Sequence, residues 1–294
     1  MEVLQINKFA SLHDGKRVFF SNTDSVLETF KEIEKLDHEV ILISGNNDTF
    51  VGFYEGDEKI YGHMNAMFMQ MPKNIKYWFA QNNITKKENI IPLPIGIQNS
   101  FSIPGTSGYD WIDPTILPRV FKEDTTRPTK YFYLNYANRP GHRKKVTEVC
   151  EKYLRIIYHQ PFKYDRYLAD VLDHEAIICP AGMGLDTHRL YETLYCKRIP
   201  ITIKVGTYGI SYSDEDEVSW AGTPYCPPQK KEYPIYTNLY AKLPVVILDS
   251  VEELKDAERL KMLIEEQKNK KWDRNMLDFA YWKNMILELK EQLQ

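Results

Sequence analysis

One segment of the chain joins a glycine turn to adjacent basic residues where a helix is expected to begin. It spans residues 179–203 and reads CPAGMGLDTHRLYETLYCKRIPITI. Gly182 and Gly184 let the backbone approach a ligand closely. His188 and Arg189 fall in the first helical turn, where backbone N–H groups lack partners and negative charge is favoured. A cation there opposes the helix dipole unless an anion lies above the turn, and a diphosphate fits that position.

Three further residues extend this predicted anion site along the helix. Asp186 is expected to cap the helix, which begins at Thr187. Glu192 lies one turn further on, on the same side as Arg189, where its carboxylate can accept hydrogen bonds from ribose hydroxyls. Arg189 can donate two hydrogen bonds to a phosphate. The alternative is a solvated helix face on which Glu192 only forms an ion pair with Arg189.

A second basic loop follows an earlier predicted strand in the same half of the chain. It reads LNYANRPGHRKK, residues 134–145, and contains Asn135, Arg139 and Arg143. Loops at the carboxyl ends of parallel strands meet at one edge of the sheet, where ligands of open α/β folds bind. We therefore expect these side chains beside the glycine turn, with Arg139 or Arg143 completing the anion site.

Strand and helix patterns alternate on both sides of a candidate linker, residues 105–129. Short apolar runs bounded by turn residues indicate strands, and apolar residues at helical spacing indicate helices. Before the linker the pattern predicts strands at 16–23, 38–43, 76–83 and 90–100 and a helix at 24–36, with the second strand breaking into a polar loop at 44–48. After it the pattern predicts strands at 130–136, 154–159, 175–180 and 198–203 and helices at 139–154, 164–174 and 187–197.

This alternation is typical of open parallel sheets. The predicted fold class is α/β, with two Rossmann-like domains facing each other across a cleft. The first domain comprises residues 1–125, and the second, which would hold the ligand, comprises residues 126–271. The helical segment 272–294 is expected to pack back onto the first domain.

The composition of the chain indicates which classes of binding partner are expected. The chain has 294 residues, with 38 basic and 41 acidic side chains and a net charge of -3. This balance argues against nucleic acid, because binding to phosphate backbones needs a basic face. No apolar run is long enough for a signal sequence or a membrane span, so we expect no membrane span and a cytoplasmic location. The four cysteines lie far apart and indicate neither a disulfide framework nor a zinc site.

The glycine-turn segment resembles the donor-binding motif of exostosin-like glycosyltransferases. The resemblance covers about residues 77–203 and extends to small members of the family from large DNA viruses. It implies a GT-B fold in which the second domain holds a nucleotide sugar, usually a UDP-sugar, and the first binds a carbohydrate acceptor. The viral kind suggests UDP-xylose as the donor and the host cytoplasm as the location. The matching positions are Pro180, Gly182, Gly184, Asp186, Arg189, Glu192 and Ile199-Pro200.

The activity implied is transfer of a sugar to a glycan hydroxyl, with inversion and without a metal or other cofactor. Arg189, the helix dipole and Arg139 or Arg143 would hold the departing diphosphate. Inversion also needs a base for the acceptor proton, and the polar loops of the first domain offer Asp48 first and His63 second. The alternative for Asp48 is an ordinary Asx turn, and a retaining enzyme would need no such base.

Two other interpretations stay open. Asp214 and Asp216 form a DxD sequence, and two carboxylates on a loop can hold Mn²⁺ or Mg²⁺, as in metal-dependent glycosyltransferases. Four acidic residues in a row are, however, more often a solvated loop. The second interpretation is a nucleotide- or glycan-binding module, which would bind without turnover. A phosphate-binding hydrolase is disfavoured because the chain contains no GxSxG nucleophile motif.

Overall fold

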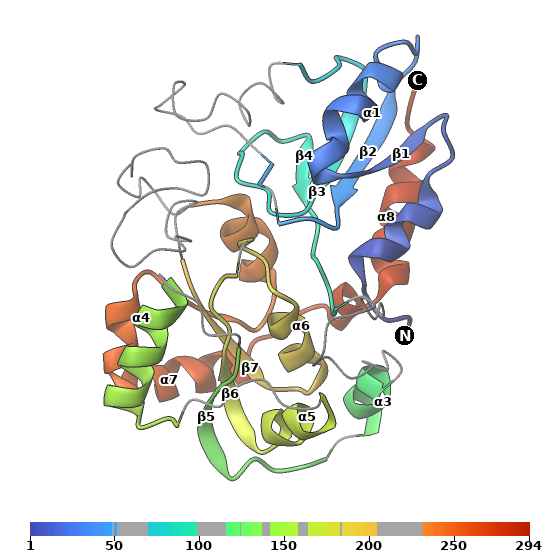
Figure 1. Ribbon diagram of the computed structural model, residues 1–294. Coiled ribbons are helices and arrows are strands. Elements are labelled where there is room, and N and C mark those ends of the chain that lie inside the picture. Colours follow the sequence, from blue (N-terminus) through green and yellow to red (C-terminus); the bar gives the residue numbers. More distant parts are fainter. Residues whose placement is uncertain are drawn as a thin grey trace, which may run out of the picture.

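The computed structural model describes residues 1–48, 50–51, 70–98, 116–123, 125–136, 142–157, 164–182, 184–204 and 232–294. It contains two parallel four-stranded sheets, in the orders β1-β2-β3-β4 and β5-β6-β7-β8 (Figure 1). The fold is therefore mixed α/β, as the alternating pattern predicts, and it is compatible with Rossmann-like units. The strands are β1 (Val18–Asn22), β2 (Val40–Gly45), β3 (Ile75–Ala80), β4 (Ile90–Pro92), β5 (Lys130–Leu134), β6 (His174–Ile178), β7 (Ile199–Ile203) and β8 (Val246–Leu248).

Helices pack against both sheets. α1 and α8 contact the first sheet, and α5, α6 and α7 contact the second. The α-helices are α1 (Val26–Ile33), α3 (Ile116–Glu123), α4 (His142–Val149), α5 (Tyr164–Leu172), α6 (His188–Tyr195), α7 (Ala257–Lys268) and α8 (Phe279–Lys290). Short 3-10 helices are η1 (Ile6–Leu12), η2 (Thr23–Ser25), η5 (Tyr240–Lys242), η6 (Val251–Lys255) and η7 (Arg274–Leu277), and π-helical turns are η3 (Cys150–Leu154) and η4 (Ile235–Leu239).

The interior strands are largely apolar because both faces of each sheet are covered. All residues of β2 and of β7 are buried, as expected for strands of parallel sheets. α1 presents Phe30 to the first sheet, where its ring meets that of Trp78 edge-on at 5.6 Å. We call residues 1–98, which form the first sheet, the N-terminal unit, and residues 116–268, which include the second sheet, the C-terminal unit.

The strand predicted at residues 154–159 is wrong for the part that the structure describes. Arg155 ends the π-helical turn η3 in the left-handed conformation, with a φ of 54°. Residues 155–157 therefore form no strand beside β5, and Ile157 is 75% exposed. Among the described strands, β5 is consequently at the edge of its sheet.

The linker predicted at residues 105–129 is also partly wrong, because it contains the helix α3. Leu117 of α3 is fully buried, and the ring of Phe121 meets that of Tyr195 on α6 edge-on at 6.2 Å. Pro118 lies in the first turn of this helix, where the missing N–H group of proline is tolerated. The proline and the polar residues around it do not indicate a helix in the sequence. Packing against α6 stabilises this helix.

The C-terminal helix α8 lies against the N-terminal unit (Figure 1). The rings of Phe9 and Phe279 meet edge-on at 5.0 Å, and Lys290 forms an ion pair with Asp14 at 3.0 Å. The side chain of Asp278 accepts a hydrogen bond from the backbone N–H of Ala280 and so caps the helix. The last helix thus completes the core of the first sheet.

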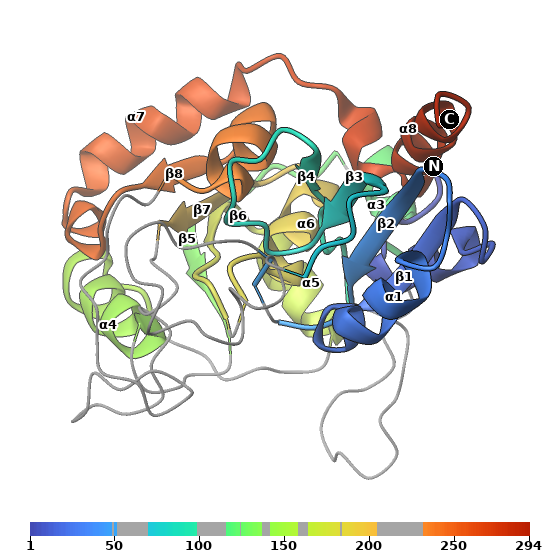
Figure 2. The same cartoon turned by 90° about the horizontal axis from the view of Figure 1, so that it is seen from above.

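A single hydrophobic cluster is shared by the two units. It includes Ile95 and Ile97 from the N-terminal unit and Leu190 and Tyr195 from α6. The backbone N–H of Leu4 also donates a hydrogen bond to the hydroxyl of Tyr195 at 3.0 Å. Figure 2 shows α6 between the two sheets. The helix that carries the predicted anion site is therefore fixed from both sides.

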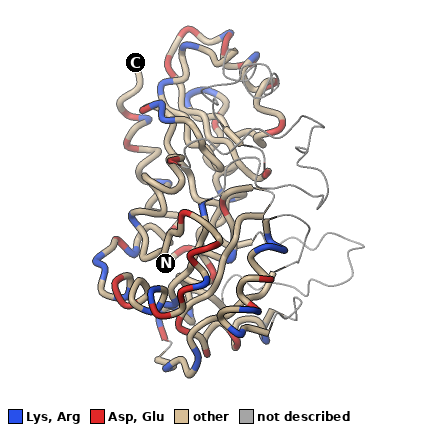
Figure 3. The backbone as a smooth tube through the Cα atoms, turned by 90° about the vertical axis from the view of Figure 1, so that its left-hand side faces the viewer, with Lys and Arg blue, Asp and Glu red and all other residues tan. Residues whose placement is uncertain are grey.

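Charges are spread over the outside of the molecule. Acidic and basic residues alternate along the outer helices and turns (Figure 3). Within the described ranges, no helix has both the length and the apolar character that crossing a lipid bilayer requires.

Candidate functional site at the carboxyl edge of the second sheet

The glycine turn connects β6 to α6. The chain leaves β6 through Cys179, whose N–H donates to the carbonyl of Ile201 at 2.7 Å. The turn is then closed by a hydrogen bond from the N–H of Gly182 to the carbonyl of Gly184 at 3.0 Å. Thr187 is the N-cap of α6, and its side chain makes no capping hydrogen bond. The expectation that Asp186 caps the helix is wrong, because other donors occupy its carboxylate.

Arg189 lies in the first turn of α6 and reaches across to the loop after β5. Its Nη1 donates to the backbone carbonyl of Asn135 and, at 3.1 Å, to the Oδ1 of the same residue. The guanidinium stacks over the ring of Tyr167 on α5, 4.7 Å from its centroid. Burial alone would lower the pKa of Arg189, but the nearby Tyr167 and Glu192 raise it. This side chain is therefore a fixed positive charge at the start of the helix.

Arg143 lies directly beneath the glycine turn. Its Nε donates to the carbonyl of Ala181 at 3.0 Å, and its guanidinium lies over the ring of Tyr136 at 5.3 Å. A Cβ atom at position 182 would lie 2.8 Å from the Nη2 of Arg143, so a larger residue there would displace this guanidinium. The two loops predicted from the sequence to share a sheet edge thus meet there, and Asn135, Arg143, Gly182 and Arg189 form one cluster.

Glu192 lies one turn further along α6 and is only 4% exposed. Burial raises the pKa of its carboxyl, and the positive charge of Arg189 lowers it in part. The hydroxyls of Tyr164 and Tyr167 are buried nearby, and the hydroxyl of Tyr167 also opposes the rise in the pKa of Glu192. The alternative of a solvated ion pair between Glu192 and Arg189 does not apply, because the carboxyl is buried.

The carboxylate of Asp186 is buried and accepts hydrogen bonds from residues of both units. Its Oδ2 accepts from the N–H of Ile95 at 2.7 Å and from the hydroxyl of Tyr191 at 2.9 Å. Its Oδ1 accepts from the N–H of Thr187 at 2.9 Å and from the hydroxyl of Tyr240 at 2.5 Å. Burial raises the pKa of this carboxyl to about 6, although the four donors oppose that rise.

His188 also contacts the N-terminal unit. Its Nδ1 lies 2.8 Å from the carbonyl oxygen of Gly96, an atom that can only accept, so Nδ1 carries the proton. Burial lowers the pKa of His188 to about 4, and the imidazole is neutral at pH 7. Of the residues predicted to bind a donor, Asp186 and His188 therefore hold the two units together.

Asp48, the first candidate base, lies in the loop after β2 and is exposed. Its backbone carbonyl accepts a hydrogen bond from the Nδ2 of Asn82 at 3.2 Å. The Oδ1 of Asn82 accepts from the N–H of Asp186 at 2.9 Å. The side chain of Asn82 thus links the Asp48 loop to the glycine turn through these two hydrogen bonds. His63, Arg139, Asp214 and Asp216 lie outside the described residues.

Sequence reasoning missed Asn82. It follows β3, is 1% exposed and has a φ of 53°, in the left-handed region where asparagine is enriched. The signal was a run of three polar residues, Gln81, Asn82 and Asn83, directly after a buried strand, and all three are buried. Buried side-chain amides are mostly hydrogen-bonded inside a protein, as those of Asn82 and Asn83 are here.

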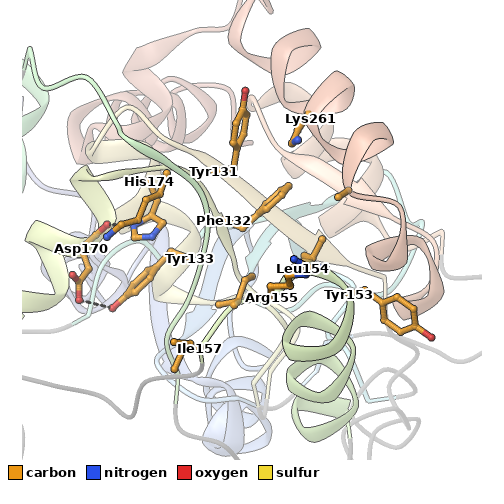
Figure 4. A pocket seen from close by; sticks show the side chains of 13 residues that line it. Tyr131, Phe132, Tyr133, Tyr153, Leu154, Arg155, Ile157, Asp170, His174 and Lys261 are labelled. Atoms are coloured by element: carbon orange, nitrogen blue, oxygen red, sulfur yellow. Dashed lines mark hydrogen bonds between the residues drawn. The ribbon is translucent and has the colours of Figure 1, made fainter.

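A cavity of about 500 Å³ opens at another place, beside the edge strand β5 (Figure 4). The exposed rings of Tyr131 and Tyr153 and the buried ring of His174 contribute to its walls. The Nδ1 of His174 donates to the carbonyl of Asp170 at 2.6 Å, and burial lowers the pKa of this histidine. The cavity lies toward the amino ends of β5 and β6, so it is separate from the cluster at the glycine turn.

Metal ligands do not gather in the described part of the chain, where no three His, Cys, Asp or Glu residues lie close enough together to hold an ion. Cys150, Cys179 and Cys196 are buried, and within the described ranges none of them forms a disulfide. Comparison with models of protein families gives no match for the chain. Comparison with curated protein sequences gives no match either.

Proposed function

We propose that the chain is a glycosyltransferase of the GT-B type, with two Rossmann-like domains facing each other across a cleft. It would transfer a sugar from a nucleotide sugar, a UDP-sugar and specifically UDP-xylose, to a hydroxyl of a glycan. The observation that carries the proposal is a pair of arginines that reach between neighbouring loops. Arg189 at the start of α6 donates to Asn135 in the loop after β5, and Arg143 donates to the carbonyl of Ala181 in the glycine turn. This turn lies at the carboxyl edge of a parallel sheet and leads into a helix, a place that favours phosphate groups.

The diphosphate of the donor would lie over the first turn of α6. Arg189 is already oriented by Asn135 and Tyr167, so little reorganisation accompanies binding. Arg143 adds a second positive charge beneath the turn. Glu192 would accept hydrogen bonds from the ribose hydroxyls. These groups stabilise the negative charge that develops on the leaving diphosphate, and no metal is required for that role.

The transfer step inverts the anomeric carbon. The acceptor oxygen forms a bond to this carbon while the bond to the diphosphate oxygen breaks, and the diphosphate keeps the electron pair. Asp48, whose side chain is exposed on the loop after β2, takes the proton of the acceptor hydroxyl. The acceptor would therefore bind on the N-terminal unit.

Calorimetric titration with UDP-sugars and GDP-sugars in EDTA tests the proposal. The wild type should bind one UDP-sugar, and Arg189→Ala should lose this binding. Arg259→Ala is the matched control, because Arg259 is an exposed arginine of α7, away from the glycine turn, that forms an ion pair with Glu253 at 2.9 Å. Retention of full affinity in Arg189→Ala would contradict the proposed site.

The same titration separates the two alternatives. Binding that needs Mn²⁺ and disappears in Asp214→Asn or Asp216→Asn would support a metal-dependent transferase instead. Tight binding without any transfer or donor hydrolysis would support a non-catalytic module.

A further inference from the structure

Asn82 connects the two sides of the proposed active site through a single side-chain amide. Its Nδ2 donates to the carbonyl of Asp48 at 3.2 Å, and its Oδ1 accepts from the N–H of Asp186 at 2.9 Å. The first partner can only accept and the second can only donate, so the orientation of the amide is determined. The loop with the candidate base and the turn before α6 are thus held by the same group.

The glycine turn is shaped around this amide. A Cβ atom at position 184 would lie 2.6 Å from the Nδ2 of Asn82 and 3.0 Å from its Oδ1. Gly184 therefore leaves the space that the side chain of Asn82 occupies. The two residues are complementary although they belong to different units.

The backbone conformation alone does not explain an asparagine at this position. With a φ of 53°, glycine would be accommodated at least as well. Compared with glycine, asparagine adds a hydrogen-bond donor that contacts the N-terminal unit and an acceptor that contacts the C-terminal unit. The buried side chain of the neighbouring Asn83 makes its two hydrogen bonds, to the carbonyl of Ile90 and from the N–H of Thr85, within the N-terminal unit.

We propose that Asn82 is a positioning residue, which holds the Asp48 loop in register with the glycine turn so that acceptor base and donor meet in the correct geometry. This role rests on the proposed transferase function. Asn82 makes no hydrogen bond to Arg143, Arg189 or Asn135, so removing its amide should disturb the relative placement of the two loops more than the affinity for the donor.

The test compares Asn82→Gly with Asn83→Ala. Asn82→Gly keeps the backbone conformation and removes both hydrogen bonds, whereas Asn83→Ala removes two buried hydrogen bonds that do not reach the turn. The quantity to measure is the ratio of sugar transfer to donor hydrolysis at saturating donor, because general destabilisation lowers both rates together. Hydrogen exchange of the peptides that cover residues 44–48 and 184–190 reports the two loops without any substrate.

In Asn82→Gly we expect both peptides to exchange faster and the ratio of transfer to hydrolysis to fall by about 10- to 100-fold, the cost of a misplacement of about 1 Å. Asn83→Ala should leave the ratio near the wild-type value. An unchanged ratio in Asn82→Gly, with donor binding intact, would overturn the positioning role. Absence of both donor binding and turnover in the wild type would instead overturn the proposed function, and the positioning role with it.

Discussion

The buried carboxyl of Asp186 should make the stability of the protein depend on pH in an unusual direction. Burial raises its pKa in the folded protein to about 6, against 3.8 for the unfolded chain. The folded state therefore binds this proton more tightly than the unfolded state does. The stabilisation is complete below pH 3.8 and is lost as the pH rises through 6. The difference between these two pKa values corresponds to about 3 kcal/mol.

Asp186→Asn isolates this effect. The amide keeps the volume of the side chain but does not titrate, and the cost of placing its NH₂ group opposite the donors is the same at every pH. Free energies of unfolding of both proteins from urea denaturation between pH 4 and pH 7 give the difference directly. We expect this difference to shift by about 2 kcal/mol in favour of the variant between pH 4 and pH 7, because the unfolded carboxyl is already partly ionised at pH 4.

A difference that stays constant with pH would refute this reasoning. A shift in the opposite direction would mean that the four donors outweigh burial and hold the pKa of Asp186 below its value in the unfolded chain. Asp186→Ala, which also lacks the titrating group, should show the same pH dependence as Asp186→Asn at a lower absolute stability.

Three further predictions concern the same region. Gly182→Ala should displace the guanidinium of Arg143, 2.8 Å from the new Cβ, and weaken UDP-sugar binding in calorimetry by roughly tenfold or more, the value of one charged hydrogen bond; unchanged affinity would exclude Arg143 from the site. Tyr240→Phe should lower the free energy of unfolding at pH 7 by about 1.5–3 kcal/mol, because a carboxylate loses a donor; equal urea midpoints would contradict this. The contribution of His188 to the free energy of unfolding of the wild type should fall by about 3 kcal/mol from pH 6.5 to pH 4, because its imidazole stays neutral in the folded protein and binds a proton in the unfolded chain. His188→Gln should lack this fall, and identical pH profiles of the two proteins would contradict the prediction.

Local patterns predicted much of the framework of the candidate site. The buried runs of β2 and β7 and the glycine turn before α6 are visible in a few consecutive residues. The meeting of Arg143 with the glycine turn also followed, because loops after neighbouring parallel strands share an edge. In each case the signal and its consequence lie within one α/β unit.

The contacts between residues far apart in the sequence could not be predicted in this way. An aspartate just before a helix looks the same whether it caps the helix or accepts hydrogen bonds from distant residues. The donors of Asp186 include Ile95, 91 positions away, and Tyr240, 54 positions away. Asn82 and Asp186 are 104 positions apart.

Arg155 ends η3 in a left-handed conformation without the glycine that normally marks such a position.

The central claim is that the chain transfers a sugar from a nucleotide donor without a metal. The most direct measurement is the formation of labelled glycan from a panel of labelled UDP-sugars and carbohydrate acceptors in the presence of EDTA. We expect transfer from one UDP-sugar, and UDP-xylose is the donor that we expect to be used. This activity should be lost in Arg189→Ala and retained in Arg259→Ala. Transfer that requires Mn²⁺, or no transfer from any donor, would contradict it.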